Sequence, residues 1–193
     1  MAGRCETENG VTEKPGSLTF ALAGNPNCGK SALFNTFTGI RQKTGNWPGV
    51  TVDRKEGRFE IDGRDVSVID LPGIYSLDAS SLDEEVTRDY LLSKNADLIV
   101  NVVDASNLER NLYLTVQLLE MGVPVVLALN MMDVARKRGI QVDTAKLSQK
   151  LGCPVVPIVA TTREGISELK ARMIAVAEGI EQGGFPLALD EVV

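Results

Sequence analysis

The sequence contains no histidine, and this absence excludes several kinds of chemistry. Ser-His and Cys-His nucleophilic catalysis and His-ligated metal sites all need an imidazole. Only three cysteines, Cys5, Cys28 and Cys153, are scattered over the 193 residues. Their odd number and wide spacing predict a reducing compartment without structural disulfides.

The chain also lacks a basic excess and a long apolar run. Its net charge of −6, with no basic stripe, predicts that nucleic acid is not a partner. No apolar run reaches the length that spans a bilayer. Residues 1–16 are polar, without a signal-peptide pattern, and we expect a disordered tail there. The remainder is globular in composition, at 44% hydrophobic and 24% charged, and long enough for one domain with a sizeable core.

A glycine-rich loop is the most informative stretch that the chain does have. Residues 24–31 match the phosphate-binding pattern G-x-x-x-x-G-K-[ST]; they read Gly24-Asn25-Pro26-Asn27-Cys28-Gly29-Lys30-Ser31. In such a loop the backbone N–H groups surround the phosphates, the lysine contacts the outer phosphates, and the serine hydroxyl ligates Mg²⁺. A buried strand over 18–23 and a helix over 31–37 flank it, as this motif requires. Cys28, inside the loop, is either a redox-sensitive thiol or a small filler.

Apolar runs alternate with amphipathic segments along the rest of the chain, which predicts an α/β fold. We expect six strands, at 18–23, 58–61, 66–69, 98–103, 123–129 and 155–159, and helices at 31–37, 83–93, 108–121, 144–151 and 166–177. Asp62-Gly63 predicts a hairpin turn between the second and third strands. The pattern indicates a small-GTPase-like P-loop fold: a mostly parallel six-stranded sheet with one antiparallel edge hairpin and helices on both faces. Residues 17–180 would form this domain, and 181–193 a linker cut short.

Two further elements point to a phosphate and magnesium site. Asp70-Leu71-Pro72-Gly73 closes a strand, where the carboxylate can hold Mg²⁺ through a water and the Gly73 N–H can contact the γ-phosphate. Gly49-Val50-Thr51-Val52, followed by Asp53, precedes the hairpin. There Thr51 can ligate Mg²⁺ and contact the γ-phosphate, so that this segment acts as a switch.

Two more elements point to guanine. In Asn130-Met131-Met132-Asp133, the carboxylate of Asp133 can accept hydrogen bonds from guanine N1–H and the N2 amino group, which adenine cannot supply. Asn130 would tie this loop to the P-loop, and Met131 stands where a lysine is usual. The competing interpretation makes Asp133 a helix N-cap.

The segment Ala160-Thr161-Thr162 follows the last strand and is the weakest of these signals. It matches the element whose backbone N–H groups contact guanine O6. Ala160 replaces the usual serine, and we expect this replacement to loosen the base.

These elements together resemble the N-terminal G domain of the bacterial ferrous-iron transport protein B family. Besides the P-loop, the matching stretches are Gly45-Asn46-Trp47-Pro48-Gly49-Val50-Thr51-Val52, Asp70-Leu71-Pro72-Gly73-Ile74-Tyr75-Ser76-Leu77 and Asn130-Met131-Met132-Asp133. Of these, the part from Asn46 to Val52 and the Met in the last stretch are specific to the family. The resemblance implies a cytoplasmic GTPase domain of an inner-membrane transporter for Fe²⁺, continued by C-terminal helical and membrane regions. Whether the domain forms a homo-oligomer stays open.

The resemblance also implies K⁺ as a cofactor beside GTP or GDP and Mg²⁺. K⁺ would be held by the Asn27 side chain and the carbonyl oxygens of Gly45 and Trp47. The alternative is that Asn27 is only a loop residue that tolerates the left-handed backbone conformation. The catalytic set would then be Asn27, Lys30, Thr51 and Gly73. Ile74 occupies the position where small GTPases carry a water-orienting glutamine, which predicts slow unaided turnover. Trp47 is either a packing anchor or an exposed residue that reports switch motion.

Two alternatives to a transport GTPase remain at this point. A soluble ribosome- or RNA-associated GTPase of the same superclass is disfavoured by Met131 and the acidic balance. A nucleotide-binding module without useful hydrolysis would fit Ile74, and a turnover assay separates it from a GTPase.

Overall fold

The computed structural model describes residues 18–39 and 41–184. The tail predicted at 1–16, and residues 185–193 of the linker predicted at 181–193, lie outside the described residues. No helix in the described ranges is long and apolar enough to cross a membrane.

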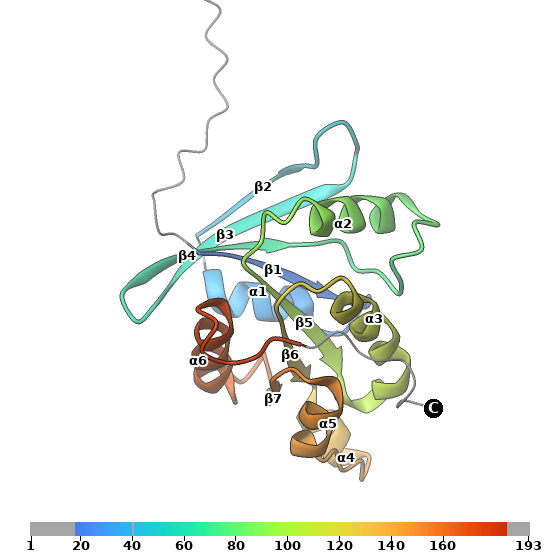
Figure 1. Cartoon of the computed structure of the whole chain (residues 1–193), viewed down its shortest axis with the longest axis vertical. Coiled ribbons are helices and arrows are strands. Elements are labelled where there is room, and N and C mark those ends of the chain that lie inside the picture. Colours follow the sequence, from blue (N-terminus) through green and yellow to red (C-terminus); the bar gives the residue numbers. More distant parts are fainter. Residues whose placement is uncertain (1–17, 40, 185–193) are drawn as a thin grey trace, which may run out of the picture.

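The described residues form a seven-stranded sheet, ordered β2-β3-β4-β1-β5-β6-β7, with helices on both faces (Figure 1). The strands are β1 (Leu18–Gly24), β2 (Gln42–Asn46), β3 (Asp53–Ile61), β4 (Arg64–Asp70), β5 (Leu98–Asp104), β6 (Val125–Asn130) and β7 (Val155–Pro157). The helices are α1 (Lys30–Thr38), α2 (Leu82–Leu92), α3 (Leu108–Glu120), α4 (Met132–Lys137), α5 (Thr144–Leu151) and α6 (Ile166–Ala177), with a 3₁₀ turn at Ala105–Asn107 before α3. The fold class expected from the sequence is confirmed.

Alternating side chains on the central strands divide the core into two layers. On β1, Phe20 and Leu22 face one layer, while Ala21 and Ala23 face the other. Helices α1 and α6 cover the first layer. Helices α2, α3, α4 and α5 contribute to the second. Because β1, β4, β5, β6 and β7 run parallel, their carboxyl ends meet at one edge, where ligands bind in open α/β sheets.

The sheet has seven strands where six were predicted, and the seventh is β2 at the edge. Its five residues are all exposed, so they carry no alternation of apolar and polar residues for sequence analysis to detect. It pairs antiparallel with β3, which pairs antiparallel with β4 through the predicted turn at Asp62-Gly63. The antiparallel edge is therefore a three-stranded ribbon rather than a hairpin.

Two predicted strands are shorter than expected. Strand β6 begins at Val125 and not at 123, because Pro124 has no N–H to donate to the ladder. Strand β7 ends at Pro157 and not at 159, because Val159 turns away to form an isolated antiparallel bridge with Glu164. The short helix α4 was not predicted, since six residues span too little of a helical period to show an amphipathic pattern.

Candidate nucleotide-binding site

The glycine-rich loop joins β1 to α1 through two residues in the left-handed region. Asn27 has a φ of 64°, and Gly29, which caps α1, has a φ of 88°. A side chain at Gly29 would be strained there, and its Cβ would lie 2.2 Å from Nδ2 of Asn130. The loop therefore needs glycine at this point both for its backbone conformation and for the close approach of Asn130.

Cys28 is a buried packing residue rather than a reactive thiol. It belongs to the core layer under α1, and a Cβ at Gly24 would lie 2.9 Å from its Sγ. Burial raises the pKa of the Cys28 thiol to about 11, although the backbone N–H and the charge of Lys30 oppose this shift. The thiolate is the reactive form of cysteine, so the filler interpretation is the one that the structure favours.

Strand β4 ends beside β1 and brings a carboxylate to the glycine-rich loop. Asp70 is in register with Leu22, and its Oδ1 lies 2.5 Å from Nζ of Lys30. Both side chains are at most one-tenth exposed, so the ion pair lies in a partly dry environment. A Cβ on Gly73 would lie 3.2 Å from Cα of Pro26, which means that the two loops are in contact.

Ile74 follows Gly73 but does not present its side chain at this edge. It is only 2% exposed and packs in the core layer that contains Leu71, Trp47 and Tyr90. Its N–H donates to the carbonyl oxygen of Gly24 at 3.2 Å. The backbone at this position therefore supports the glycine-rich loop, and the side chain has no access to a water molecule at the strand ends.

Asn130 clamps three segments together at the carboxyl end of β6. Its Nδ2 donates to the carbonyl oxygen of Cys28 at 3.0 Å, and its Oδ1 accepts from the N–H of Ala160 at 3.0 Å. The hydroxyl of Thr36 in α1 donates to the carbonyl oxygen of Ala160. Asn130 is 3% exposed, so these bonds are made without competing water. The tie between this residue and the P-loop, expected from the sequence, is present.

The backbone turns sharply after Asn130, and Met131 and Asp133 lie at this turn and the start of α4. Met131 has a φ of 61° and is the N-cap residue of α4, and its side chain makes no capping hydrogen bond. Asp133 lies in the first turn of α4 and is not its N-cap, so the capping interpretation of Asp133 is wrong. The methyl of Met131 lies 3.6 Å from the position of a Cβ on Gly29, which puts this side chain beside the glycine-rich loop.

The loop after β7 is held by bonds that the sequence analysis did not anticipate. Arg136 of α4 makes two hydrogen bonds to the carboxylate of Glu164, at 2.9 and 3.0 Å, and this carboxylate raises the pKa of the guanidinium. The N–H of Thr162 donates to Val159. The N–H of Ala160 donates to Asn130, as described above. Of the three backbone N–H groups at residues 160–162, only that of Thr161 has no acceptor among the described residues.

The predicted switch segment forms the end of the β2–β3 ribbon. Gly45 is in register with Arg54, and Asn46 with Asp53. Between the strands is a turn in which the N–H of Val50 donates to the Trp47 carbonyl. Thr51 and Gly45 are exposed.

Trp47 is 7% exposed and packs edge-on against Tyr90 of α2, with 5.3 Å between ring centroids. The packing-anchor interpretation of Trp47 is therefore confirmed, while exposure of its ring is not found. Sequence analysis could not identify Tyr90 as its partner, because the two residues are far apart in the chain.

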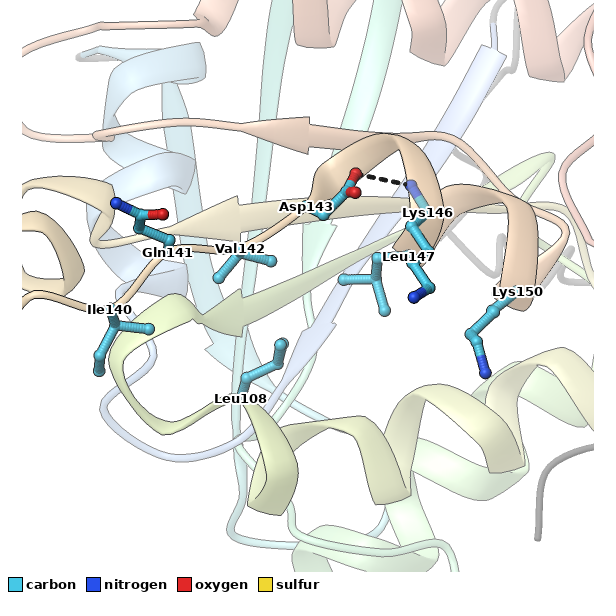
Figure 2. Close-up of a pocket in the computed structure, with 8 residues that line it drawn as sticks. All are labelled: Leu108, Ile140, Gln141, Val142, Asp143, Lys146, Leu147 and Lys150. Carbon is cyan, nitrogen blue, oxygen red and sulfur yellow. Dashed lines mark hydrogen bonds between the residues drawn. The ribbon is translucent and has the colours of Figure 1, made fainter.

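A cavity of about 320 Å³ lies elsewhere, between the start of α3 and α5 (Figure 2). Figure 2 shows Leu108 on one side and Leu147, Lys146 and Lys150 of α5 on the other, with Ile140 to Asp143 closing the end. The lining of this cavity includes no residue of the glycine-rich loop and none of Asp70, Asn130 and Ala160. This cavity is therefore separate from the candidate site.

The parallel sheet, the glycine-rich loop at the end of β1 and the clamp at the end of β6 define a P-loop domain of the G-domain type. Comparison with known proteins identifies the family. The family model for Ferrous iron transport protein B matches residues 18–173, and the chain belongs to this family.

Curated relatives and solved structures agree with this assignment. The Fe(2+) transporter FeoB of Salmonella typhimurium is 57% identical over 157 residues, which are 79% of this chain and 20% of that protein. The same figures hold for FeoB of Escherichia coli K12. The chain thus spans about a fifth of the length of the curated relatives it matches.

Three solved structures illustrate the likeness in fold. The cytosolic domain of L. pneumophila FeoB aligns with a TM-score of 0.83 at 48% identity, over 89% of this chain and 66% of that one. The G domain of T. maritima FeoB aligns with a TM-score of 0.79 at 47% identity, over 83% and 99% of the two chains. An S. thermophilus NFeoB mutant bound to GDP aligns with a TM-score of 0.79 at 50% identity, over 82% and 62%.

Proposed function

We propose that this chain is a guanine-nucleotide-binding and GTP-hydrolysing domain that regulates Fe²⁺ uptake by a membrane transporter. The observation that carries the proposal is the Asn130 clamp, because it joins the phosphate loop and the Ala160 loop at the edge where Asp133 also lies. A related protein is described as bound to GDP, which agrees with a guanine nucleotide as ligand. Family membership argues against the alternative of a ribosome- or RNA-associated GTPase.

Guanine would be selected by hydrogen bonds at the ends of β6 and β7. The carboxylate of Asp133 would accept from N1–H and the N2 amino group, and a buried acceptor left unmet by adenine is costly. Because Asn130 engages the Ala160 N–H, we assign the bond to guanine O6 to the N–H of Thr161. The side chain of Met131 lies beside the glycine-rich loop and would cover the base without adding a charge.

The residues around Lys30 fit a magnesium-bound triphosphate. Asp70 offers a poorly exposed carboxylate 2.5 Å from the Lys30 ammonium, and Ser31 follows Lys30 in the first turn of α1. Mg²⁺ prefers hard oxygen ligands and usually keeps waters and phosphate oxygens in its shell. Ser31, Thr51 and Asp70 would hold it, directly or through water, and when bound it supplies charge neutralisation between the phosphates.

Hydrolysis would proceed by in-line attack of water on the γ-phosphate, with the protein supplying position and positive charge. Lys30, the N–H of Gly73 and the N-terminus of α1 would act on the phosphate oxygens. Ile74 is buried and cannot orient the attacking water, so unaided turnover should be slow. Asn27, with the carbonyl oxygens of Gly45 and Trp47, would hold K⁺, which supplies one further positive charge when bound.

The whole protein extends the proposal beyond this chain. Curated relatives are about five times as long, so the helical and membrane regions expected from the family would be the partners of this domain. One relative is described as a cytosolic domain, and we place this chain on the cytoplasmic side of the inner membrane by analogy.

Steady-state GTP hydrolysis in KCl and in NaCl tests the proposal. We expect slow turnover in NaCl, strong stimulation by KCl, and loss of that stimulation in Asn27→Ala. Asn95→Ala, at an exposed loop position, is the matched control and should respond to KCl like the unchanged chain. Equal slow rates in both salts would refute the K⁺ site, and GDP binding without any turnover would favour a nucleotide-binding module instead.

A further inference from the structure

A second cavity, of about 210 Å³, lies between the turn that follows β2 and helix α2. Its lining residues come from these two segments only: Trp47, Pro48 and Val50 from the turn, and Leu82, Glu85, Val86, Asp89 and Tyr90 from the helix. It is separate from the cavity between α3 and α5, and its lining includes no residue of the glycine-rich loop.

The floor of this cavity is apolar and aromatic. Trp47 and Tyr90 meet edge to face within it, and Val86 is partly buried beside them. Leu82 is 43% exposed at the margin, which is high for a leucine that lines a cavity. The indole N–H of Trp47 is buried and has no acceptor among the described residues. The cavity thus offers an apolar and aromatic surface to an occupant.

The rim of the cavity is acidic. Glu85 and Asp89 are exposed, and they share one face of α2 because they are four residues apart. Two arginines lie nearby, and each is engaged with a carboxylate. Arg88 is 3.5 Å from Asp89, and Arg54, which lies over the indole of Trp47, pairs with Glu56. No basic side chain lines the cavity itself. An occupant would therefore meet a net negative field at the entrance.

We propose that this cavity is a docking site for a partner protein, which inserts one bulky apolar side chain flanked by lysine or arginine. An apolar cavity of about 150 Å³ holds a benzene ring, so this volume suits a phenylalanine or leucine side chain. Basic flanking residues would pair with Glu85 and Asp89 and steer the encounter. A second copy of this chain fits poorly, since a symmetric contact would bring the acidic faces of two α2 helices together.

The position of the cavity gives its occupant a route to the nucleotide. Its turn leads directly to Thr51, and α2 follows the segment that contains Asp70 and Gly73. This coupling to the nucleotide rests on the proposed function. If the bound nucleotide moves either segment, the affinity for the partner changes, and the partner then changes the affinity for the nucleotide by the same factor. Docking itself needs no nucleotide and stands without that step.

Intrinsic fluorescence tests the docking site directly, because Trp47 is the single tryptophan of the chain. The probe is a short synthetic peptide with Leu-Phe flanked on both sides by lysines and without tryptophan or tyrosine. We expect a saturable change in Trp47 emission without added nucleotide, and weaker binding at high salt. A peptide with glutamates in place of the lysines, and one with serines in place of Leu-Phe, should leave the emission unchanged.

Charge reversal on α2 locates the binding. The double variant Glu85→Lys and Asp89→Lys should raise the Kd for the lysine peptide about tenfold or more. Glu168→Lys, an exposed reversal on α6, is the matched control and should leave the Kd within about twofold. An unchanged thermal midpoint of each variant shows that folding is intact.

Three outcomes would overturn the docking proposal: equal binding of the lysine and glutamate peptides, no effect of the double reversal, or a concentration-dependent dimer in sedimentation that the double reversal abolishes. Failure of the proposed GTPase function would appear differently, as peptide binding with no turnover. Repeating the titration with GDP and with a non-hydrolysable GTP analogue then measures the coupling between the two sites.

Discussion

Replacing Asn130 with alanine should weaken both folding and nucleotide binding. The side chain donates to Cys28 O and accepts from Ala160 N–H, each at 3.0 Å, and it is 3% exposed. Removing it leaves both backbone groups buried without a partner, at about 1–3 kcal/mol each. The expected loss in the free energy of unfolding is therefore about 2–6 kcal/mol. In urea, at an m-value of about 2 kcal/mol per M, the midpoint should fall by about 1–3 M.

A matched control separates loss of stability from loss of the clamp. Asn101 is also buried, but its Nδ2 donates to the Thr115 hydroxyl of α3 at 2.6 Å rather than to the glycine-rich loop. Asn101→Ala should reduce the free energy of unfolding while leaving GDP affinity unchanged. Asn130→Ala should reduce both, since the glycine-rich loop and the Ala160 loop lose their shared tie. An unfolding free energy within about 0.5 kcal/mol of the unchanged chain, with unaltered GDP affinity, would refute the argument.

Two further predictions concern the base and the buried thiols. Asp133→Asn should lower GDP affinity by about 100-fold or more and favour xanthosine diphosphate. The reason is that a carboxamide N–H pairs with the xanthine 2-oxo group and not with the guanine amino group. Competition binding with both nucleotides measures this change. Burial raises the pKa of Cys28 to about 11 and that of Cys153 to about 12, from 9.0. The folded state thus favours the neutral thiols. This stabilisation is complete below pH 9 and is lost as the pH rises through about 11 for Cys28 and about 12 for Cys153, so both thiols contribute between pH 9 and pH 11. The free energy of unfolding should fall by about 3 kcal/mol per pH unit in that interval. Urea unfolding at several pH values should show about half of this slope in Cys153→Ala, and an unchanged slope would contradict the assignment.

The sequence predicted those parts of the fold that leave a local pattern. The helix after the glycine-rich loop, the hairpin turn at Asp62-Gly63 and the buried central strands all carry periodicity or turn residues, and all are present. Strand β2 and helix α4 leave no such pattern, because one is wholly exposed and the other is too short. Contacts with other segments hold them instead: β2 pairs with β3, and the N–H of Met132 in α4 donates to the carbonyl oxygen of Ile158.

The candidate site was predicted as a set of motifs, and its internal geometry was only partly predictable. The tie between Asn130 and the glycine-rich loop followed from the motif, and the structure contains it. The packing of Trp47 against Tyr90, and the pair between Arg136 and Glu164, join residues distant in sequence. Such contacts depend on how the elements pack in three dimensions, which single-sequence patterns do not record.

Strand β6 has a mechanical consequence for any protein that contains this domain. At its last residue is the Asn130 clamp, and at its first residue the N–H of Val125 donates to the carbonyl oxygen of Gly183, beyond α6. All six residues of β6 are buried, and the strand is paired on both sides. Such a strand is stiff along its length of about 20 Å. A displacement of Asn130 along the strand would therefore be carried to the opposite end of β6, where the polypeptide returns from α6.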